Sequence, residues 1–449
     1  MGNQQRKAMT TTISAPANFI VNENETVTTA GPNFSGHPAY FRERQQAAWE
    51  NFTQLPMPVR TDESWRFSDI KALDLSTFQR AQAVAESERA ALLARSTGLA
   101  ETAGRMVFAN DHLLTQEFHG DALRAKGVLW MPLAQAIATQ RELIEKHFMR
   151  EGAILGSEKF AALHESQVCN GTFLYVPRGV EIELPIECFH WEQGECGAIF
   201  PHTLIIAEPI SKVTVVDYFQ SAGEGPGLSC GANDFIIGDG AKVTYVAVQH
   251  LNRQTLAFRI NNTVVARDAS ALALVLNLGG RYVRSEAASH LRGPGGRSDM
   301  LSITSVEGSQ VVDQRTLQIH EAPNTASDLL YKNALNDQSR SIFTGLIRVD
   351  PGAHKTDAYQ KVRNLLLTDE AESNSAPGLE IEADDVRCSH GATTGQVDAE
   401  ELFYLLSRGI PLREAQRLVV FGFLNEVTER LTYEPLQELL RERLHARLG

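Results

Sequence analysis

The chain has 449 residues, too many for one ordinary compact core, so we expect two or three domains. Hydrophobic residues make up 43% and charged residues 22% of the sequence, which is the composition of a globular protein. The formal charge of −13 argues against a general affinity for nucleic acid or anionic membranes, and no apolar run is long enough to span a bilayer.

The N-terminal residues lack the apolar core of a secretory signal. The chain has five cysteines, an odd number at sparse spacing: Cys169, Cys188, Cys196, Cys230 and Cys388. This pattern favours reduced thiols, and we expect a cytoplasmic protein.

The first third of the chain is expected to be mostly helical. Residues 1–36 are rich in Thr, Asn, Ala and Gly without a sustained period, which predicts a flexible arm. Residues 37–165 are predicted to form a mainly helical domain. Apolar spacing predicts helices over about 40–52, 83–96 and 132–151, with Val107–Ala109 as a possible strand.

Residues 166–395 consist of short β-type runs separated by Gly, Pro, Asn and Asp. Lys212–Val216 recurs thirty positions later as Lys242–Val246, Ala271–Val275 follows twenty-nine further on, and Asp299–Ile303 comes after a similar step. A repeat made of strands predicts a solenoid whose stacked coils share one core, and we favour a β-helix core over a sandwich. The periodicity does not fix the handedness.

Residues 396–449 return to helical spacing and form a predicted C-terminal helical domain. Asp398 can cap a helix that ends at Gly409, and Pro411 can open a second helix as its first residue. A third helix is expected from about Glu434 to Ala446. Such a tail on a solenoid makes a cap and a docking surface.

Signatures of common enzymes are missing from the sequence. It contains no P-loop, no Gly-x-Ser-x-Gly elbow and no His-Glu-x-x-His helix. The glycine clusters Gly238–Gly240 and Gly293–Gly296 lie in the strand-rich region and are interpreted as turns. We therefore predict a non-catalytic protein that does not bind ATP through a P-loop.

One group of possible metal ligands lies early in the strand region. Cys188, His190, Cys196 and His202 fall within fifteen residues, and thiolate with imidazole can hold zinc or iron. The spacing lacks a Cys-x-x-Cys knuckle, which is the specific part of such motifs. We interpret these cysteines, and the other lone cysteines of this region, as buried small hydrophobes.

Cys388 and His390 stand at the end of the strand region. Alternation along a strand places both on one side, about 7 Å apart. This arrangement suits two ligands of a shared metal or cluster, or one ligand with a supporting thiol. Arg387 could lower the pKa of the Cys388 thiol. From the residues alone, a structural role and a ligand role are equally supported.

A resemblance to a known family rests on four runs: Glu63–Asp69, Gly171–Glu181, Val386–Gly395 and Leu402–Ile410. With the residues between them they cover about 40–449, nearly the whole chain. These runs resemble the SufB/SufD family of iron–sulfur cluster assembly scaffolds. The resemblance implies a right-handed parallel β-helix flanked by an N-terminal and a C-terminal helical domain.

Two departures favour the SufD type within this family. SufB-type chains are similar around Arg363 and Asn364 but then carry a cluster-holding cysteine, where this chain has Thr368. They also carry a Glu directly after the histidine, where this chain has Gly391. The Cys-Ser-His-Gly form that remains is similar to SufD.

The resemblance implies a scaffold subunit of the SufBCD complex. Such a subunit pairs with SufB through the β-helix and recruits the ATPase SufC through its C-terminal helices. His390 is implied to act at the SufB interface in cluster assembly or iron delivery, with Cys388 beside it as a second candidate ligand of a transient cluster or iron shared with SufB.

Several alternatives stay open at this point. One is a SufB-like primary scaffold, and another is a β-helix enzyme acting on polysaccharide, for which no paired carboxylates can be placed. Flavin binding and a homodimer of the isolated chain are also undecided by the sequence.

Overall fold

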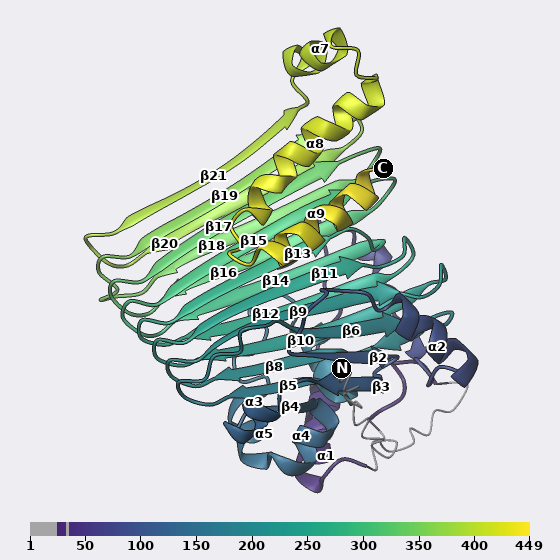
Figure 1. Cartoon of the computed structure of the whole chain (residues 1–449), viewed down its shortest axis with the longest axis vertical. Coiled ribbons are helices and arrows are strands. Elements are labelled where there is room, and N and C mark those ends of the chain that lie inside the picture. Colours follow the sequence, from purple (N-terminus) through teal and green to yellow (C-terminus); the bar gives the residue numbers. More distant parts are fainter. Residues whose placement is uncertain (1–24, 33–35) are drawn as a thin grey trace, which may run out of the picture.

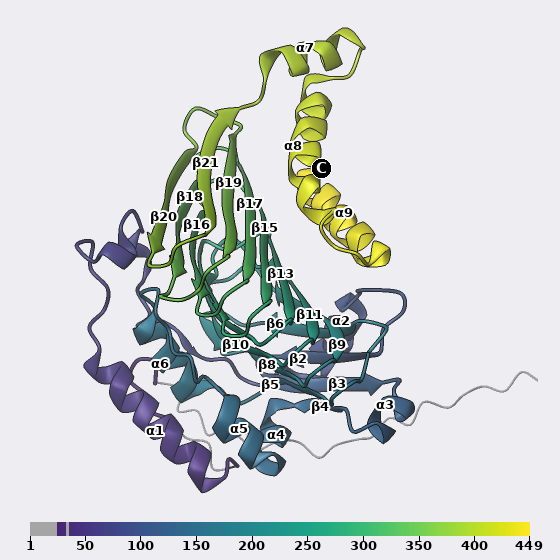
Figure 2. The ribbon, with the colours of Figure 1, turned by 90° about the vertical axis from the view of Figure 1, so that its left-hand side faces the viewer.

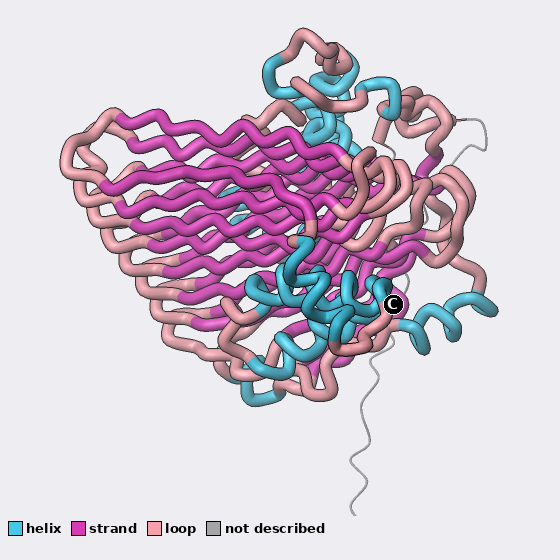
Figure 3. Tube along the Cα trace, turned by 90° about the horizontal axis from the view of Figure 1, so that it is seen from above, coloured by secondary structure: helices cyan, strands magenta, loops and turns pink. Residues whose placement is uncertain are grey.

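The computed structural model describes residues 25–32 and 36–449, and its main feature is a solenoid of parallel strands (Figure 1). Successive strands alternate between two sheets that stack coil upon coil (Figure 3). The predicted β-helix is confirmed, and its parallel pairing between coils excludes the antiparallel sandwich.

The strands form two sheets. In spatial order the first sheet contains β20 (Glu372–Ile381), β18 (Arg340–Val349), β16 (Val311–His320), β14 (Tyr282–Leu291), β12 (Leu256–Val265), β10 (Gly227–Ile237), β8 (His202–Ala207), β5 (Gly171–Val176) and β4 (Leu129–Pro132), with β7 (Gly197–Ile199) and β1 (Gln79–Arg80) joined at β10. The second contains β21 (Arg387–Gln396), β19 (Asp357–Leu366), β17 (Ala326–Leu335), β15 (Arg297–Val306), β13 (Ser270–Asn277), β11 (Lys242–His250), β9 (Lys212–Ser221), β6 (Ile186–Glu192), β2 (Gly104–Ala109) and β3 (His112–Phe118).

The register between coils corrects part of the sequence alignment. Lys242 pairs with Lys212, as the repeat predicts. Ala271 pairs with Val243 and Ser298, however, and not with Lys242 and Asp299. The alignment was therefore wrong by one residue at each of these steps, because the coils differ in length and the turns absorb the difference. A one-residue slip matters, since it would move every side chain to the opposite face of its strand.

The corner before each strand of the second sheet from β9 to β21 uses the left-handed backbone region. Ile210, Asp268 and Lys355 have φ of 61°, 54° and 59° although none is glycine. The backbone N–H of each donates to a carbonyl of the next coil, for example Ile210 to Asp239 at 2.8 Å. These bonds between coils stabilise a conformation that costs a non-glycine residue about 1 kcal/mol or more.

Side chains on the inner face of the second sheet form a row through the solenoid. Its first members are aromatic, since Phe108 stacks on His190 and His190 on Phe219 with ring centroids 5.2 and 5.1 Å apart. The later members are amides and hydroxyls: Gln249, Asn277, Thr304, Asn333, Asn364 and Thr394. Asn333 Nδ2 donates to Asn364 Oδ1 at 2.8 Å, so these buried polar groups bond to one another.

Most N-terminal helices cover the beginning of the solenoid and one face of the first sheet, whereas the helix Glu86–Arg95 packs on the second sheet (Figure 2). They are α1 (Ala39–Gln54), α2 (Glu86–Arg95), α3 (Asp121–Ala125), α4 (Leu133–Thr139), α5 (Arg141–His147) and α6 (Glu158–Gln167). The single helix expected over 132–151 is two helices, because Gln140 leaves the helical region with φ −121° and ψ 45°. The arm expected over 1–36 lies largely outside the described residues.

Three helices end the chain, as predicted: α7 (Ala399–Ser407), α8 (Leu412–Thr428) and α9 (Glu434–Leu448). Asp398 Oδ1 accepts from the backbone N–H of Glu400 at 2.7 Å, which confirms the cap. Pro411 precedes α8 and is not its first residue. α8 and α9 lie along the outer face of the second sheet, whereas α7 projects beyond it (Figure 2). None of the described helices is long and apolar enough to cross a membrane.

Candidate functional site

The candidate ligands Cys388 and His390 lie on β21, the final strand of the solenoid. In the described part of the chain, β21 pairs with β19 alone, so its other edge has no strand beside it. Cys388 pairs in register with Ala358, and His390 with Gln360. The site therefore lies at the open end of the solenoid, on the first part of β21 and away from α7, which follows the far end of that strand (Figure 1).

The register also fixes which way the two side chains point. Ala358 and Gln360 are buried on the inner face of β19, at 0% and 2% exposure. Because paired residues of parallel strands point to the same side, Cys388 and His390 lie on the inner face of β21. His390 is nevertheless exposed, since no further coil covers it. The prediction that both residues share one side is supported by this register.

Cys388 is half-buried and packs beside Ile347, Val349 and Ala358. Burial raises the pKa of its thiol, and the nearby Asp357 carboxylate raises it further. The expectation that Arg387 would lower this pKa was wrong, because adjacent residues of a strand point to opposite faces. The thiol is therefore not activated within the isolated chain.

The positions that distinguish the two family types have different surroundings. Thr368 follows β19, and its hydroxyl donates to the carbonyl of Asp337 at 2.7 Å. A Cβ on Gly391 would meet no atom within 4 Å, so a larger side chain would have space there. The absence of a Glu at Gly391 is therefore not a steric requirement of this fold.

The free edge of β21 can accept another strand. Arg387 N donates to Thr356 O at 2.8 Å, so alternation directs the N–H groups of residues 387, 389, 391 and 393 to β19 and those of the even positions to the free edge. β21 contains no proline and one charged residue, whereas the neighbouring edge strand β20 contains Pro377. Edge strands usually carry proline or several charges to prevent pairing, and β21 lacks both devices.

The opposite end of the solenoid is covered. Arg89 of α2 donates to the carbonyl of Leu114 on the edge strand β3. Gln116 Nε2 on the same strand donates to the carbonyl of Trp130 at 3.0 Å. Side chains thus occupy two backbone acceptors at the N-terminal edges, whereas no side chain of the described residues is bonded to the free edge of β21 in this way.

α7 has an apolar surface without a cover in the described structure. Its residues Phe403 and Tyr404 are 71% and 56% exposed, and no residue of α7 is buried. The structure reveals that the solenoid does not bury this helix. An exposed cluster of large apolar side chains is typical of a protein interaction surface.

The earlier Cys and His residues are not brought together as a metal site. His190 is stacked between two aromatic rings, and burial lowers its pKa to about 3. His202 Nδ1 instead lies 3.1 Å from His164 Nε2. Burial raises the pKa of the Cys169 and Cys230 thiols to about 12, in agreement with buried, unreactive cysteines. Over residues 25–32 and 36–449, no group of three or more His, Cys, Asp or Glu is arranged to hold a metal ion.

Comparison with known proteins identifies relatives over most of the chain. The family model "SUF system FeS cluster assembly, SufBD core domain" matches residues 189–423, and "SufBD protein N-terminal region" matches residues 34–188. An iron–sulfur cluster assembly protein SufD of Bacillus subtilis is 34% identical over 322 residues, which cover 71% of this chain and 73% of the relative. The SufD of Escherichia coli is 30% identical over 414 residues, covering 90% and 93%.

Proposed function

The chain belongs to the SufBD family of iron–sulfur cluster assembly proteins, and from this we propose that it is a SufD-type, non-catalytic scaffold subunit that pairs with SufB. Its role in iron–sulfur cluster assembly follows from the family. The pairing, the recruitment of SufC and the role of His390 are the proposed part.

One observation carries the proposal: His390 lies on a strand whose backbone edge is free. A strand of SufB that added to β21 would extend the second sheet and satisfy the free N–H and carbonyl groups of the even positions. The same addition would bring residues of SufB next to the exposed imidazole of His390. The interface and the chemical site would then coincide.

The available ligands suit a site that two chains complete. A neutral imidazole binds iron, and a thiolate binds iron or a cluster, but a cluster requires several such ligands. β21 offers His390 and, with a raised thiol pKa, Cys388. We propose His390 as the first ligand from this chain, acting on a transient cluster or on iron as cargo, and Cys388 as a supporting thiol that ionises on metal binding.

The C-terminal helices are the proposed docking site of SufC. α8 and α9 bury their apolar faces on the second sheet, which leaves Phe403 and Tyr404 of α7 for a partner. The chain has no P-loop, so ATP hydrolysis in the complex is assigned to SufC.

The test compares His390→Ala with Ser389→Ala, its neighbour on the opposite face of β21. Each variant is co-expressed with SufB and SufC, and the cells are assayed for complex recovery and for the activity of an iron–sulfur enzyme. We expect both variants to form the complex and only His390→Ala to lose cluster supply. Normal enzyme activity with His390→Ala would overturn the site assignment.

A second measurement separates this proposal from a SufB-like primary scaffold. The purified chain is incubated with ferrous iron and sulfide under anaerobic conditions and followed by its visible absorption. We expect no stable cluster on this chain alone. A stable cluster that His390→Ala abolishes would favour the primary scaffold.

A further inference from the structure

The interior of the solenoid contains an arginine that forms no ion pair with a carboxylate of the described residues. Arg259 of β12 is 6% exposed, and its guanidinium lies 4.0 Å from the ring centroid of Phe219. Its Nη1 donates to the carbonyls of Ser229 and Phe258 at 3.1 Å, and its Nη2 donates to Ser229 Oγ at 2.9 Å. Nε has no hydrogen-bond partner, and among the described residues no Asp or Glu oxygen forms an ion pair with this side chain.

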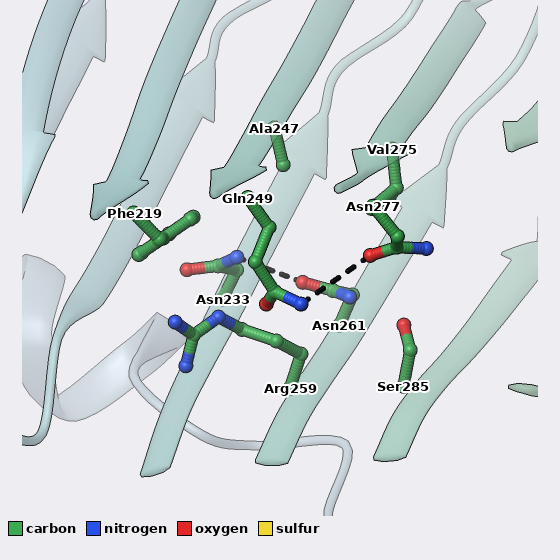
Figure 4. A pocket seen from close by; sticks show the side chains of 9 residues that line it. All are labelled: Phe219, Asn233, Ala247, Gln249, Arg259, Asn261, Val275, Asn277 and Ser285. Carbon is green, nitrogen blue, oxygen red and sulfur yellow. Dashed lines mark hydrogen bonds between the residues drawn. The ribbon is translucent and has the colours of Figure 1, made fainter. Parts of the chain in front are cut away.

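A small cavity lies against this guanidinium (Figure 4). The cavity has a volume of about 10 Å³, which is room for one water-sized particle. Apart from Arg259, its polar lining consists of neutral side chains: Asn233, Gln249, Asn261, Asn277 and Ser285. Primary amides donate two N–H groups each and can bind an anion as readily as a water.

Two buried carboxylates, Asp217 and Asp111, are near enough to act on the charge of Arg259, but neither forms an ion pair with it. Asp217 accepts hydrogen bonds at Oδ2 from the hydroxyls of Thr203 at 2.6 Å and Tyr245 at 2.8 Å, whereas its Oδ1 has no hydrogen-bond partner among the described residues. Asp111 lies 3.8 Å from Arg80. Burial lowers the pKa of Arg259 to about 10, so the guanidinium still carries its charge at neutral pH. A buried charge without a close counter-charge is costly, and a bound ion of opposite sign removes much of that cost.

We propose that this cavity binds one monovalent anion of about the size of chloride. The Nε–H of Arg259 is its charged donor, and the amides of Gln249 and Asn261 lie around it. Gly231 supports the arrangement, because a Cβ there would come within 2.9 Å of Arg259 Nη1 and displace the guanidinium. The site stands apart from His390 and does not depend on the role proposed for it.

The first test places a heavy anion in the unmodified chain. Crystals are grown from bromide, and anomalous diffraction is collected at the bromine edge. We expect an anomalous peak in the cavity beside Arg259 Nε. Density for a water without an anomalous signal would overturn the proposal, because a water in the cavity, and not an anion, would then solvate the guanidinium of Arg259.

The second test measures halide-dependent stability in solution. The chain is unfolded thermally at constant ionic strength, with chloride replacing gluconate, which is too large for the cavity. We expect Tm to rise with chloride in the unmodified chain and in Arg267→Met, an exposed control with the same loss of charge, and to be independent of chloride in Arg259→Met. An equal rise in all three proteins would overturn the site. If Arg259→Met does not fold, Arg259→Lys, which keeps the charge but lacks Nε, serves with the bromide experiment.

Discussion

The guanidinium of Arg284 lies 3.8 Å from the ring centroid of Trp65, which joins the short helix Glu63–Trp65 to the outer face of the first sheet. Arg284 is fully buried and forms ion pairs with Asp313 at 2.7 Å and Glu286 at 2.8 Å. Its Nη2 also donates to the carbonyl of Ser64 at 2.9 Å. A motif early in the sequence is thus attached to coils in the middle of the solenoid.

Removal of this arginine should destabilise the chain strongly. Arg284→Met leaves the buried carboxylate of Glu286 without its cation and leaves Asp313 with Arg315 alone, and breaking a buried pair in this way costs about 3–5 kcal/mol. Arg340→Met is the control, because its pair with Glu372 lies at the surface and should be worth about 1 kcal/mol or less. Urea unfolding measures both. Equal losses in the two variants would show that the buried network does not hold the Trp65 segment in place.

The free edge of β21 should tolerate proline only at the positions that face away from β19. Ala392→Pro removes an N–H directed to the free edge, so we expect weaker binding to SufB with little change in Tm. Thr393→Pro removes a hydrogen bond to β19 and should lower Tm. Pull-down with SufB and thermal unfolding provide the two readouts. Unchanged SufB binding by Ala392→Pro would argue against pairing at this edge.

The apolar surface of α7 should be needed for binding and not for folding. Phe403→Asp places a charge on a side chain that is 71% exposed, so the free energy of unfolding should change by about 0.5 kcal/mol or less. We expect recovery of SufC with this variant to fall, whereas Ser407→Asp on the same helix should retain it. Co-purification of the three subunits is the measurement. Full recovery of SufC with Phe403→Asp would remove α7 from the docking site.

Glu192 should make stability depend on pH. Burial raises its pKa to about 7, against about 4.5 in the unfolded chain, so its folded form binds the proton more tightly. The stability from this proton is fully present below about pH 4.5 and is lost as pH rises through about 7. Glu192→Gln should therefore gain up to about 3 kcal/mol relative to the unmodified chain between pH 5 and 8.

The control for this pH effect is Glu195→Gln, an exposed position in the following turn. Its stability should remain parallel to that of the unmodified chain over the same pH range. Urea unfolding at several pH values gives the comparison. A constant difference between Glu192→Gln and the unmodified chain would mean that Glu192 titrates alike in both states.

Local sequence patterns were sufficient for much of the fold. The strand repeat predicted the solenoid, and Asp398 and Gly409 marked the ends of α7, because capping and backbone preferences act over a few residues. Alternation also placed Cys388 and His390 on one face. The same alternation directs Arg387 to the opposite face, so Arg387 does not lower the pKa of the Cys388 thiol.

Only the tertiary structure decided which residues the inner and outer faces of the strands contact. The one-residue shift at Ala271 depends on turn lengths between coils, and the contact of Arg284 with Trp65 joins distant segments. The burial of Arg259 and the exposure of His390 have one cause: both lie on inner faces, but further coils cover β12 and none covers β21. The sequence by itself determined that Cys388 and His390 share one face of a strand, because alternation is local, whereas the register between coils and the place where the stacking ends decided that this face is the inner one and that His390 is exposed.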